Sequence, residues 1–439
     1  MSLLPTQLWH NRSLPARWRS LPENSFIVSA VFEDLKERWT RQRIQEECQI
    51  SAYQLAECEY PWAEITTMVP GEADLECARI SNITGAAILT NDSDLLVHDL
   101  GPHGSVVLLN SVQSQVEIQN STETEIQGLR LHPQNICQRL GIEDIRRFAF
   151  ELKRNPHLSF LELLHLSKGP FSTKNSAANY MSFLSEYPYM EDVFVGLECK
   201  LQNQLLDPRV SELFWQFELP KIFRGTEPPR FYLGILHEDY ARRCAWEQGR
   251  NYRALGYSIL NLSRPVTAQI PTIHEFVRRG ERIVAEQVTL SDTKTVTADL
   301  NALEERLEFA RKVFGHDHRL SFWILFALSE IYRDSKPMSR PNASRLERLL
   351  REGYMGDKTD WTDIHLVAQI HAVLYSLRML KQLIGITSKD RLVSQFNTVL
   401  TCLPPLHILL ASRYNITRSF PTGEPGRLVC QLFRAYGTF

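Results

Sequence analysis

Two short acidic clusters constrain the fold of this 439-residue chain more than any other feature. Glu72 and Asp74 follow one apolar run, and Asp92 and Asp94 follow another, AAILT at 86–90. Carboxylates that lie close together repel one another unless a cation neutralises them. Hard oxygen ligands of this kind suit Mg²⁺ or Mn²⁺, the ions of phosphoryl chemistry. The pattern predicts a cation site wherever the fold brings the two clusters together.

The segment around the acids has the pattern of an α/β layer. Residues 60–69 are expected to form a strand, 72–81 a helix, 86–90 a short buried strand and 105–110 a further strand. In open α/β sheets, ligands bind beyond the carboxyl ends of the strands, where both clusters would lie. One cluster alone would be explained by acids at a helix start. Two clusters at adjacent strand ends favour a shared cation site.

The amino-acid sequence of this segment resembles that of a known family. The stretch VPGEADLECA at 69–78, followed by AILTNDSDLL at 87–96, resembles the internal region of the flap-endonuclease/XPG nucleases. It is most similar to the Asteroid-type branch, and the resemblance is firm over about residues 60–150. In the C-terminal half it is weak, resting on RALGYSIL from Arg253 and EFVRRG from Glu275.

The resemblance implies a PIN-like nuclease fold, in which a parallel sheet flanked by helices carries a site with two divalent metals, Mg²⁺ or Mn²⁺. Glu72, Asp74, Asp92 and Asp94 match the family's metal ligands and catalytic acids. Two ions held about 3.5–4 Å apart would activate water and stabilise the leaving oxygen of a phosphodiester. Structured DNA or RNA is the partner that the resemblance implies. A nuclear location is suggested by the family alone.

The sequence also departs from the family pattern. Family members begin with a strand that carries an early Asp, with a second Asp before the arch, and we expect this N-terminal part of the domain to be missing. Asp34, on a polar helix face, is not equated with either residue. The family's later G-x-D-Y motif, whose glycine hairpin grips the duplex backbone, is also absent, since the segment at 139–144 is RLGIED. Asp144 is expected to be a helix-start acid. Three explanations remain: a truncated copy or misassigned start, a degenerate member, or other residues that complete the site.

Net charge, cysteine spacing and the length of the apolar runs restrict the kind of protein that this chain can be. A net charge of −2 gives no overall cationic field, so any nucleic-acid contact must be a local patch. The eight cysteines include no CxxC pair and fit reduced thiols in an intracellular protein. No apolar run approaches about 18 residues, so we expect no membrane span.

The pattern along the chain predicts three parts: an irregular leader at 1–22, a partial XPG-type α/β domain at 23–168, and a mainly helical region at 169–439. Helical periodicity supports the last part and the end of the second. The expected helices lie at 26–39, 133–140, 143–154, 159–168, 303–314, 320–333 and 364–384.

Two basic features have alternative interpretations. Lys36, Arg38, Arg41 and Arg43 are either a solvated helix end or a basic ridge that contacts phosphates. A mixture of aromatic residues and arginines between 215 and 257 would either stack bases or pack in a core beside solvated arginines. Its members are Trp215, Phe231, Tyr232, Trp246, Tyr252 and Tyr257, with Arg230, Arg242, Arg243, Arg250 and Arg253.

Two functions follow from these observations. The first is a metal-dependent, structure-selective nuclease that acts on DNA or RNA, impaired if the N-terminal acids of the family are missing. The second is a catalytically inactive binding or scaffold protein with a degenerate nuclease domain, whose working surface would be the helical half at 170–439.

Overall fold

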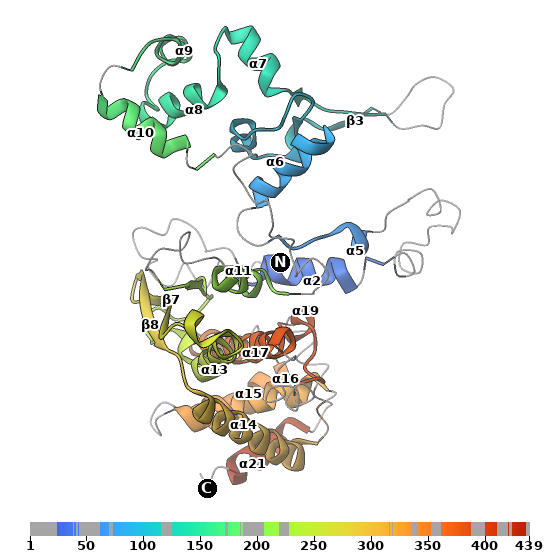
Figure 1. The fold of residues 1–439 in the computed structure, drawn as a ribbon. Coiled ribbons are helices and arrows are strands. Elements are labelled where there is room, and N and C mark those ends of the chain that lie inside the picture. The colour runs from blue at the N-terminus through green and yellow to red at the C-terminus, as the bar shows by residue number, and fades with distance from the viewer. Residues whose placement is uncertain are drawn as a thin grey trace. The chain divides into compact units, whose positions relative to one another are not determined.

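The computed structural model groups the chain into two compact units. Unit 1 combines residues 1–68 with 203–439, and unit 2 comprises 69–202. Their elements are labelled in Figure 1. The structure describes residues 24–37, 39–40, 43, 62–69, 73–115, 125–171, 174–184, 186–187, 206–218, 228–315, 317, 319–335, 340–352, 361–387, 400–410, 420 and 424–435.

The predicted boundaries after residues 22 and 168 stay a prediction. Contacts within the structure instead divide the chain after residues 68 and 202. The predicted leader at 1–22 lies outside the described residues. Helix α2 (Ile27–Glu37) packs against α19 (Leu406–Leu409), near the other end of the chain. Unit 1 is therefore built from both ends of the chain, and unit 2 is inserted between them.

Unit 2 contains a small mixed sheet with the order β1–β2–β5. Strand β1 (Ala87–Thr90) pairs in parallel with β2 (Ser105–Leu108), which pairs antiparallel with β5 (Arg130–Leu131). Helix α6 (Ala73–Thr84) contacts β1, and a small core joins them around Ala78 and Val106. A separate hairpin joins β3 (Gln113–Gln115) to β4 (Glu125–Gln127). The helix and the parallel pair lie where the sequence predicts them.

Two details of this region differ from the sequence prediction. Strand β1 is not covered on both faces, because Leu89 is 59% exposed. Of the strand predicted at 60–69, the described residues 62–69 form none: Trp62–Ile65 form the short helix α5, followed by irregular backbone. Tertiary contacts explain the helix, since Ala63 is buried and its carbonyl accepts a hydrogen bond of 2.7 Å from Lys36 Nζ of α2. Such contacts override strand preference.

Four short helices complete unit 2: α7 (Pro133–Leu140), α8 (Ile145–Arg154), α9 (Phe160–Lys168) and α10 (Lys174–Leu184). The first three confirm the predicted helices. Asp144 caps α8, as expected, by accepting the backbone N–H of Arg146 at 2.8 Å. Gly141 ends α7 with φ of 63°, a conformation that favours glycine, and this common helix cap does not test whether the family's glycine hairpin is missing.

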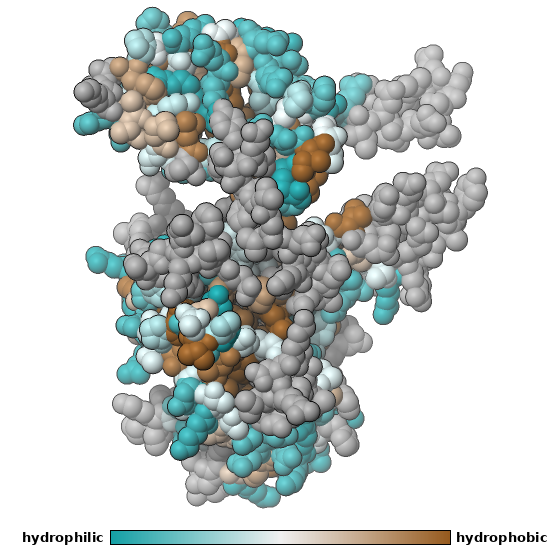
Figure 2. Space-filling view, in the orientation of Figure 1, coloured by the Kyte–Doolittle hydropathy of each residue, from teal (hydrophilic) through white to brown (hydrophobic). Residues whose placement is uncertain are grey.

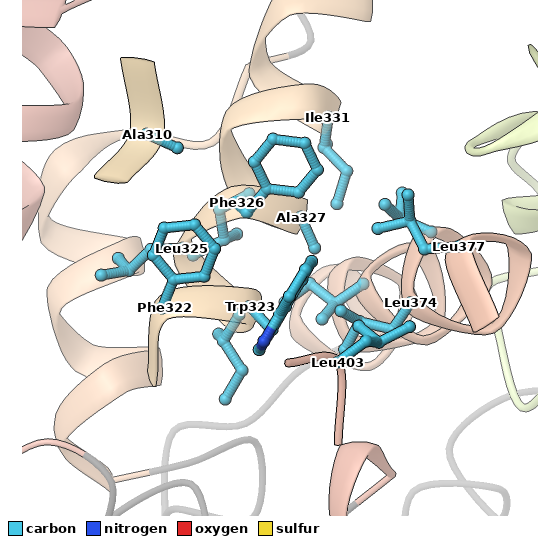
Figure 3. Packing of buried hydrophobic residues seen from close by; sticks show 14 of the residues in the cluster. Ala310, Phe322, Trp323, Leu325, Phe326, Ala327, Ile331, Leu374, Leu377 and Leu403 are labelled. Carbon is cyan, nitrogen blue, oxygen red and sulfur yellow. The ribbon is translucent and has the colours of Figure 1, made fainter. Parts of the chain in front are cut away.

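The helices of unit 1 pack around the long helix α17 (Trp361–Thr387), which is buried along most of its length. Its Leu374 and Leu377 belong to a cluster with Phe322, Trp323 and Phe326 of α15, shown in Figure 3. Helices at all three predicted C-terminal positions are confirmed. The remaining helices are α11 (Pro208–Glu218), α13 (Arg250–Leu262), α14 (Thr293–Phe314), α15 (Leu320–Asp334), α16 (Ala343–Glu352) and α21 (Glu424–Ala435).

Unit 1 also contains a sheet that the sequence did not predict. Strand β6 (Arg230–Tyr232) pairs in parallel with β7 (Thr272–Arg279), which forms a hairpin with β8 (Arg282–Thr289). Gly280 turns the hairpin with φ of 60°. The region predicted as mainly helical is thus helical around a three-stranded sheet.

Charged groups buried in unit 1 are arranged as pairs. Arg253 Nε lies 2.8 Å from Glu275, and Arg278 Nε lies 2.8 Å from Glu238. All four side chains are almost completely buried. Ions removed from water in this way are tolerated only when partners compensate them. The pairs therefore specify one arrangement of α13, the sheet and the loop that contains Glu238.

A third charged cluster holds α2 to the C-terminal helices. The guanidinium of Arg378 lies 2.9 Å from Glu33 and 3.0 Å from Asp207. The other oxygen of Glu33 accepts the backbone N–H of Leu406 at the start of α19, a favourable place for an anion. One cation on α17 thus connects three distant segments.

Among the described residues, no helix is both long and apolar enough to cross a membrane. Apolar residues do reach the surface, as the brown areas of Figure 2 show.

Replacing Arg378 with Met should destabilise unit 1 strongly, because Glu33 and Asp207 would remain buried without their cation. We expect a loss of about 3–5 kcal/mol in the free energy of unfolding, measured by urea denaturation. Arg427→Met is the matched control, since Arg427 forms an exposed pair with Glu424 and should lose less than about 1 kcal/mol. Equal losses in the two variants would contradict the role of Arg378.

Acid should weaken the fold through His365. Burial, aided by the nearby Arg242, lowers the pKa of His365 to about 4, while the Glu238 carboxylate 3.7 Å away is already paired with Arg278. Between pH 6.5 and 4 the unfolded chain binds a proton that the folded chain does not, so stability falls as pH falls. His365 should account for about 2 kcal/mol lost between pH 7 and pH 5.

The check is urea denaturation at both pH values for the wild type and His365→Gln. The variant should lose less stability on acidification than the wild type. An identical pH dependence in the two proteins would show that His365 is not responsible.

Candidate functional site

The predicted acids Asp92 and Asp94 lie directly after β1, at the carboxyl end of the parallel pair. The backbone N–H of Asp92 donates to Thr90 Oγ1 at 2.9 Å, and that of Asp94 donates to Asp92 Oδ1 at 3.0 Å. These bonds turn the chain into the short 3₁₀ helix Ser93–Val97, which Asp92 caps. Both carboxyl groups are on the surface. The local sequence thus places two acids within one turn at the end of the strand.

Asp74 lies in the first turn of α6, the helix that packs on β1. The neighbouring acid Glu76 is paired with Arg79 of the same helix, with 2.5 Å between the nearest atoms. No such ion pair involves Asp74, Asp92 or Asp94 among the described residues. Glu72, the fourth predicted ligand, lies outside the described residues.

The imidazole of His98 shows that the three described acids lie in one neighbourhood. Burial lowers the pKa of His98, and the negative charges of Asp74, Asp94 and Asp92 oppose this effect. All three carboxylates are therefore within electrostatic range of the same ring. Within the described structure, the buried Nδ1 atom of His98 has no hydrogen-bond partner. We call Asp74, Asp92, Asp94 and His98 the acidic edge.

Two further side chains border the acidic edge. The ring of Tyr187 packs edge-on against His98, with 5.0 Å between ring centroids. Burial and the charge of Asp94 raise the pKa of Tyr187. Lys153, at the end of α8, donates to Glu186 at 2.8 Å, which raises its pKa, and Asp94 adds to this shift. The acidic edge thus has one basic residue and one aromatic residue beside it.

The donor chemistry of the acidic edge fits a hard divalent cation. Carboxylate oxygens are the preferred ligands of Mg²⁺ and Mn²⁺, and three carboxylates without a described ion pair favour a cation electrostatically. In the described part of the chain, however, no three side chains of His, Cys, Asp or Glu form a complete cation-binding group. The ligand set therefore stays a prediction, of which Glu72 is the member outside the described residues.

The basic residues predicted after α2 are only partly described. Lys36 donates to the carbonyl of Ala63 and thereby holds α5 against α2. Arg43 is exposed, and Arg38 and Arg41 lie outside the described residues. A phosphate-binding role for this group stays a prediction, with Lys36 serving a structural contact.

Sequence analysis missed His98, Tyr187 and Lys153 as neighbours of the acids. His98 directly follows the 3₁₀ helix and lies only four residues after Asp94, and this closeness in sequence could have pointed to it. Tyr187 and Lys153 belong to segments whose approach depends on the packing of α8 and α10, which no local pattern reveals.

Comparison with protein families identifies the chain. Residues 23–290 match a family described as XPG domain containing. The chain belongs to the XPG-domain family. This match supports a nuclease-like role, nucleic-acid substrates and the divalent metals that XPG nucleases generally use. Neither the comparison with curated proteins nor the comparison with solved structures finds a match.

Mg²⁺ or Mn²⁺ should stabilise this XPG-domain chain through its acidic edge. At a metal concentration about ten times the Kd, binding to the folded state adds about 1.4 kcal/mol, a rise of a few degrees in Tm. The double variant Asp92→Asn, Asp94→Asn should lose the rise while keeping the Asp92 cap, since Asn also accepts that hydrogen bond.

Differential scanning fluorimetry with and without metal measures the effect. Glu76→Gln is the matched control, because Glu76 lies in the same helix as Asp74 but is paired with Arg79. It should respond to metal as the wild type does. A metal-induced rise that persists in the double variant would locate the cation elsewhere.

Proposed function

We propose that this protein is a divalent-metal-dependent, structure-selective nuclease that hydrolyses phosphodiester bonds of DNA or RNA. Its proposed catalytic acids and metal ligands are Glu72, Asp74, Asp92 and Asp94. The observation that carries the proposal is that Asp92 and Asp94 lie within one turn after β1, with Asp74 in the first turn of α6, the helix that contacts β1, in an XPG-domain chain. None of the three forms an ion pair within the described part of the chain.

The position of the acids supports hydrolysis rather than a purely structural role. Acids that only cap helices are satisfied by backbone N–H groups or by a local arginine, as Asp144 and Glu76 are. Asp92 is also a cap, but Asp94 caps no helix, and its charge acts on His98 and Lys153. Negative charge held together without a counter-charge destabilises the fold, so its retention favours a cation-binding function.

When bound, the cations would activate water and neutralise charge on the phosphoryl oxygens. The reaction forms a bond between the water oxygen and phosphorus and breaks the bond to the leaving oxygen, which receives the proton. Asp74, Asp92 and Asp94 would hold the cations together with Glu72. Lys153 would meet a backbone phosphate beside Asp94, and His98, kept neutral by burial, would leave the negative charge of the edge undiminished.

Finer assignments belong to the same proposal. The motifs at 69–78 and 87–96 support the Asteroid-type branch and a PIN-like fold for unit 2. Use of two Mg²⁺ or Mn²⁺ ions and a nuclear location follow from membership of such a branch.

The cleavage assay tests the proposal directly. The wild type should cleave fluorescently labelled flap, bubble or single-stranded substrates only with Mg²⁺ or Mn²⁺. Asp92→Asn with Asp94→Asn should reduce the rate by more than about a hundredfold, because two of the ligands lose their charge. Glu76→Gln should cleave at the wild-type rate. Cleavage that is equal in the wild type and the double variant, or absent from both, would exclude catalysis by these acids.

A specific observation favours a second function, that of a catalytically inactive nucleic-acid-binding or scaffold protein. The described residues contain no complete cation-binding group, although three of the four predicted acids are described. This alternative predicts no cleavage by the wild type, together with salt-dependent nucleic-acid binding that survives the double substitution. The same protein preparations therefore distinguish the two functions.

A further inference from the structure

The sheet of unit 1 has two faces of opposite character. Glu275 and Val277 of β7 point to the interior, where Glu275 binds Arg253 and Tyr257 of α13. Because side chains alternate along a strand, His274 and Phe276 point to the other face. Tyr232 of β6 lies beside Phe276 in the pairing and is 53% exposed. One face thus packs on a helix, and the other, which we call the open face, reaches solvent around Tyr232.

The open face carries two stacked aromatic rings. The rings of Tyr232 and Phe276 are nearly parallel, with an interplanar angle of 21° and 4.3 Å between centroids. The other aromatic residues predicted in this region are largely core: Phe231, Trp246, Tyr252 and Tyr257 are all buried. Tyr232 therefore differs from them, since its ring is available at the surface while the neighbouring Phe231 fills the interior.

The charged strand residues of the open face are all basic. Strand alternation and register place on it Arg230, Tyr232, Thr272, His274, Phe276, Arg278, Ile283, Ala285, Gln287 and Thr289. None of these is acidic. The carboxylates of the sheet, Glu275 and Glu286, belong to the opposite face, where Arg253, Arg250 and Arg279 bind them. These strand positions are thus apolar, aromatic or basic, and the acid Glu238, from outside the sheet, meets Arg278 at one end of the face.

The face has a defined end. Arg278 donates to Glu238 and to the carbonyls of Tyr240, Arg242 and Gly280, so its guanidinium is fully used by the fold. The exposed part of this face lies around the stacked rings. Arg230 of β6 pairs in register with His274 on one side, and Ile283 of β8, which is 48% exposed, lies on the other side. We call this area, formed by Arg230, Tyr232, His274, Phe276 and Ile283, the stacking face.

We propose that the stacking face binds single-stranded nucleic acid. A base would stack on Tyr232, supported from behind by Phe276, and the adjoining phosphate would meet Arg230 and His274. Exposed aromatic rings on a sheet beside basic side chains supply the two interactions that unpaired strands offer, base stacking and phosphate charge. In a duplex the bases are stacked on one another and cannot reach such rings.

The absence of carboxylates from these strand positions favours a polyanion over a basic peptide. An acidic peptide would match the charge but would leave the flat aromatic pair without a stacking partner. Binding here is distinct from chemistry at the acidic edge, because none of the residues of the stacking face belongs to unit 2.

Fluorescence anisotropy with the full chain tests the proposal. The probe is a labelled oligothymidylate of about 20 nucleotides, and EDTA is present so that no cleavage occurs. Tyr232→Ala should weaken binding roughly five- to a hundredfold, the usual effect of losing one base stack. Tyr232→Phe, which keeps the ring, should bind as the wild type does. Arg230→Gln should lower the slope of log affinity against log salt by about 0.7 for each phosphate that it no longer neutralises.

Two controls keep the outcomes separate. Phe309→Ala removes an exposed ring from α14, outside the sheet, and should bind the probe as the wild type does. Asp92→Asn with Asp94→Asn should also bind normally, so failure of the nuclease proposal leaves this one standing. No binding by the wild type, or equal binding by Tyr232→Ala and Phe309→Ala with unchanged circular dichroism, would overturn the proposal. The latter result would indicate a protein partner or another nucleic-acid site.

Discussion

Buried pairing of guanidinium with carboxylate is the interaction on which unit 1 depends. Arg253, Arg278 and Arg378 each lie within about 3 Å of a buried acid, and each acid comes from a different segment. Apolar packing around α17 supplies most of the driving force for folding, but it tolerates many arrangements. The buried ion pairs are compatible with only one arrangement of the helices, because a shifted helix would leave an ion without its partner. They therefore determine which helix meets which strand.

The carboxylates of unit 2 are in the opposite environment to the buried acids of unit 1. There Asp74, Asp92 and Asp94 lie near the surface and close to one imidazole, and no arginine among the described residues neutralises them. An acid that stabilises unit 1 is enclosed and paired, whereas an acid at the edge of β1 is exposed and has no ion-pair partner in the described structure. We propose that this contrast separates acids that serve the fold from acids that bind a ligand, and it could not be drawn from composition, since the net charge is close to zero.

Local patterns in the sequence predicted the elements better than their surroundings. The helices of 133–168, helix α6 and strand β1 were found because apolar spacing and capping residues act over a few neighbours. The pairing of β6 with β7 was missed because it joins residues some forty positions apart, whereas the β7–β8 hairpin around Gly280 is local and was overlooked. Tyr232 and Phe231 illustrate the limit: both are aromatic, and only strand alternation separates a surface ring from a core ring. The acids were predicted from their motif and their role stays a prediction, whereas the positions of His98 and Lys153 depend on tertiary packing.

The insertion of unit 2 between the two parts of unit 1 sets an order for folding during synthesis. Residues 69–202 are continuous, so this unit can form as soon as the ribosome releases it. Glu33 has to wait, because its partners Arg378 and Leu406 are made more than 340 residues later. Until then Glu33 is solvated, and the side of α2 that carries Phe32 is uncovered. The amino-terminal helix of this protein is thus among the last to reach its final place.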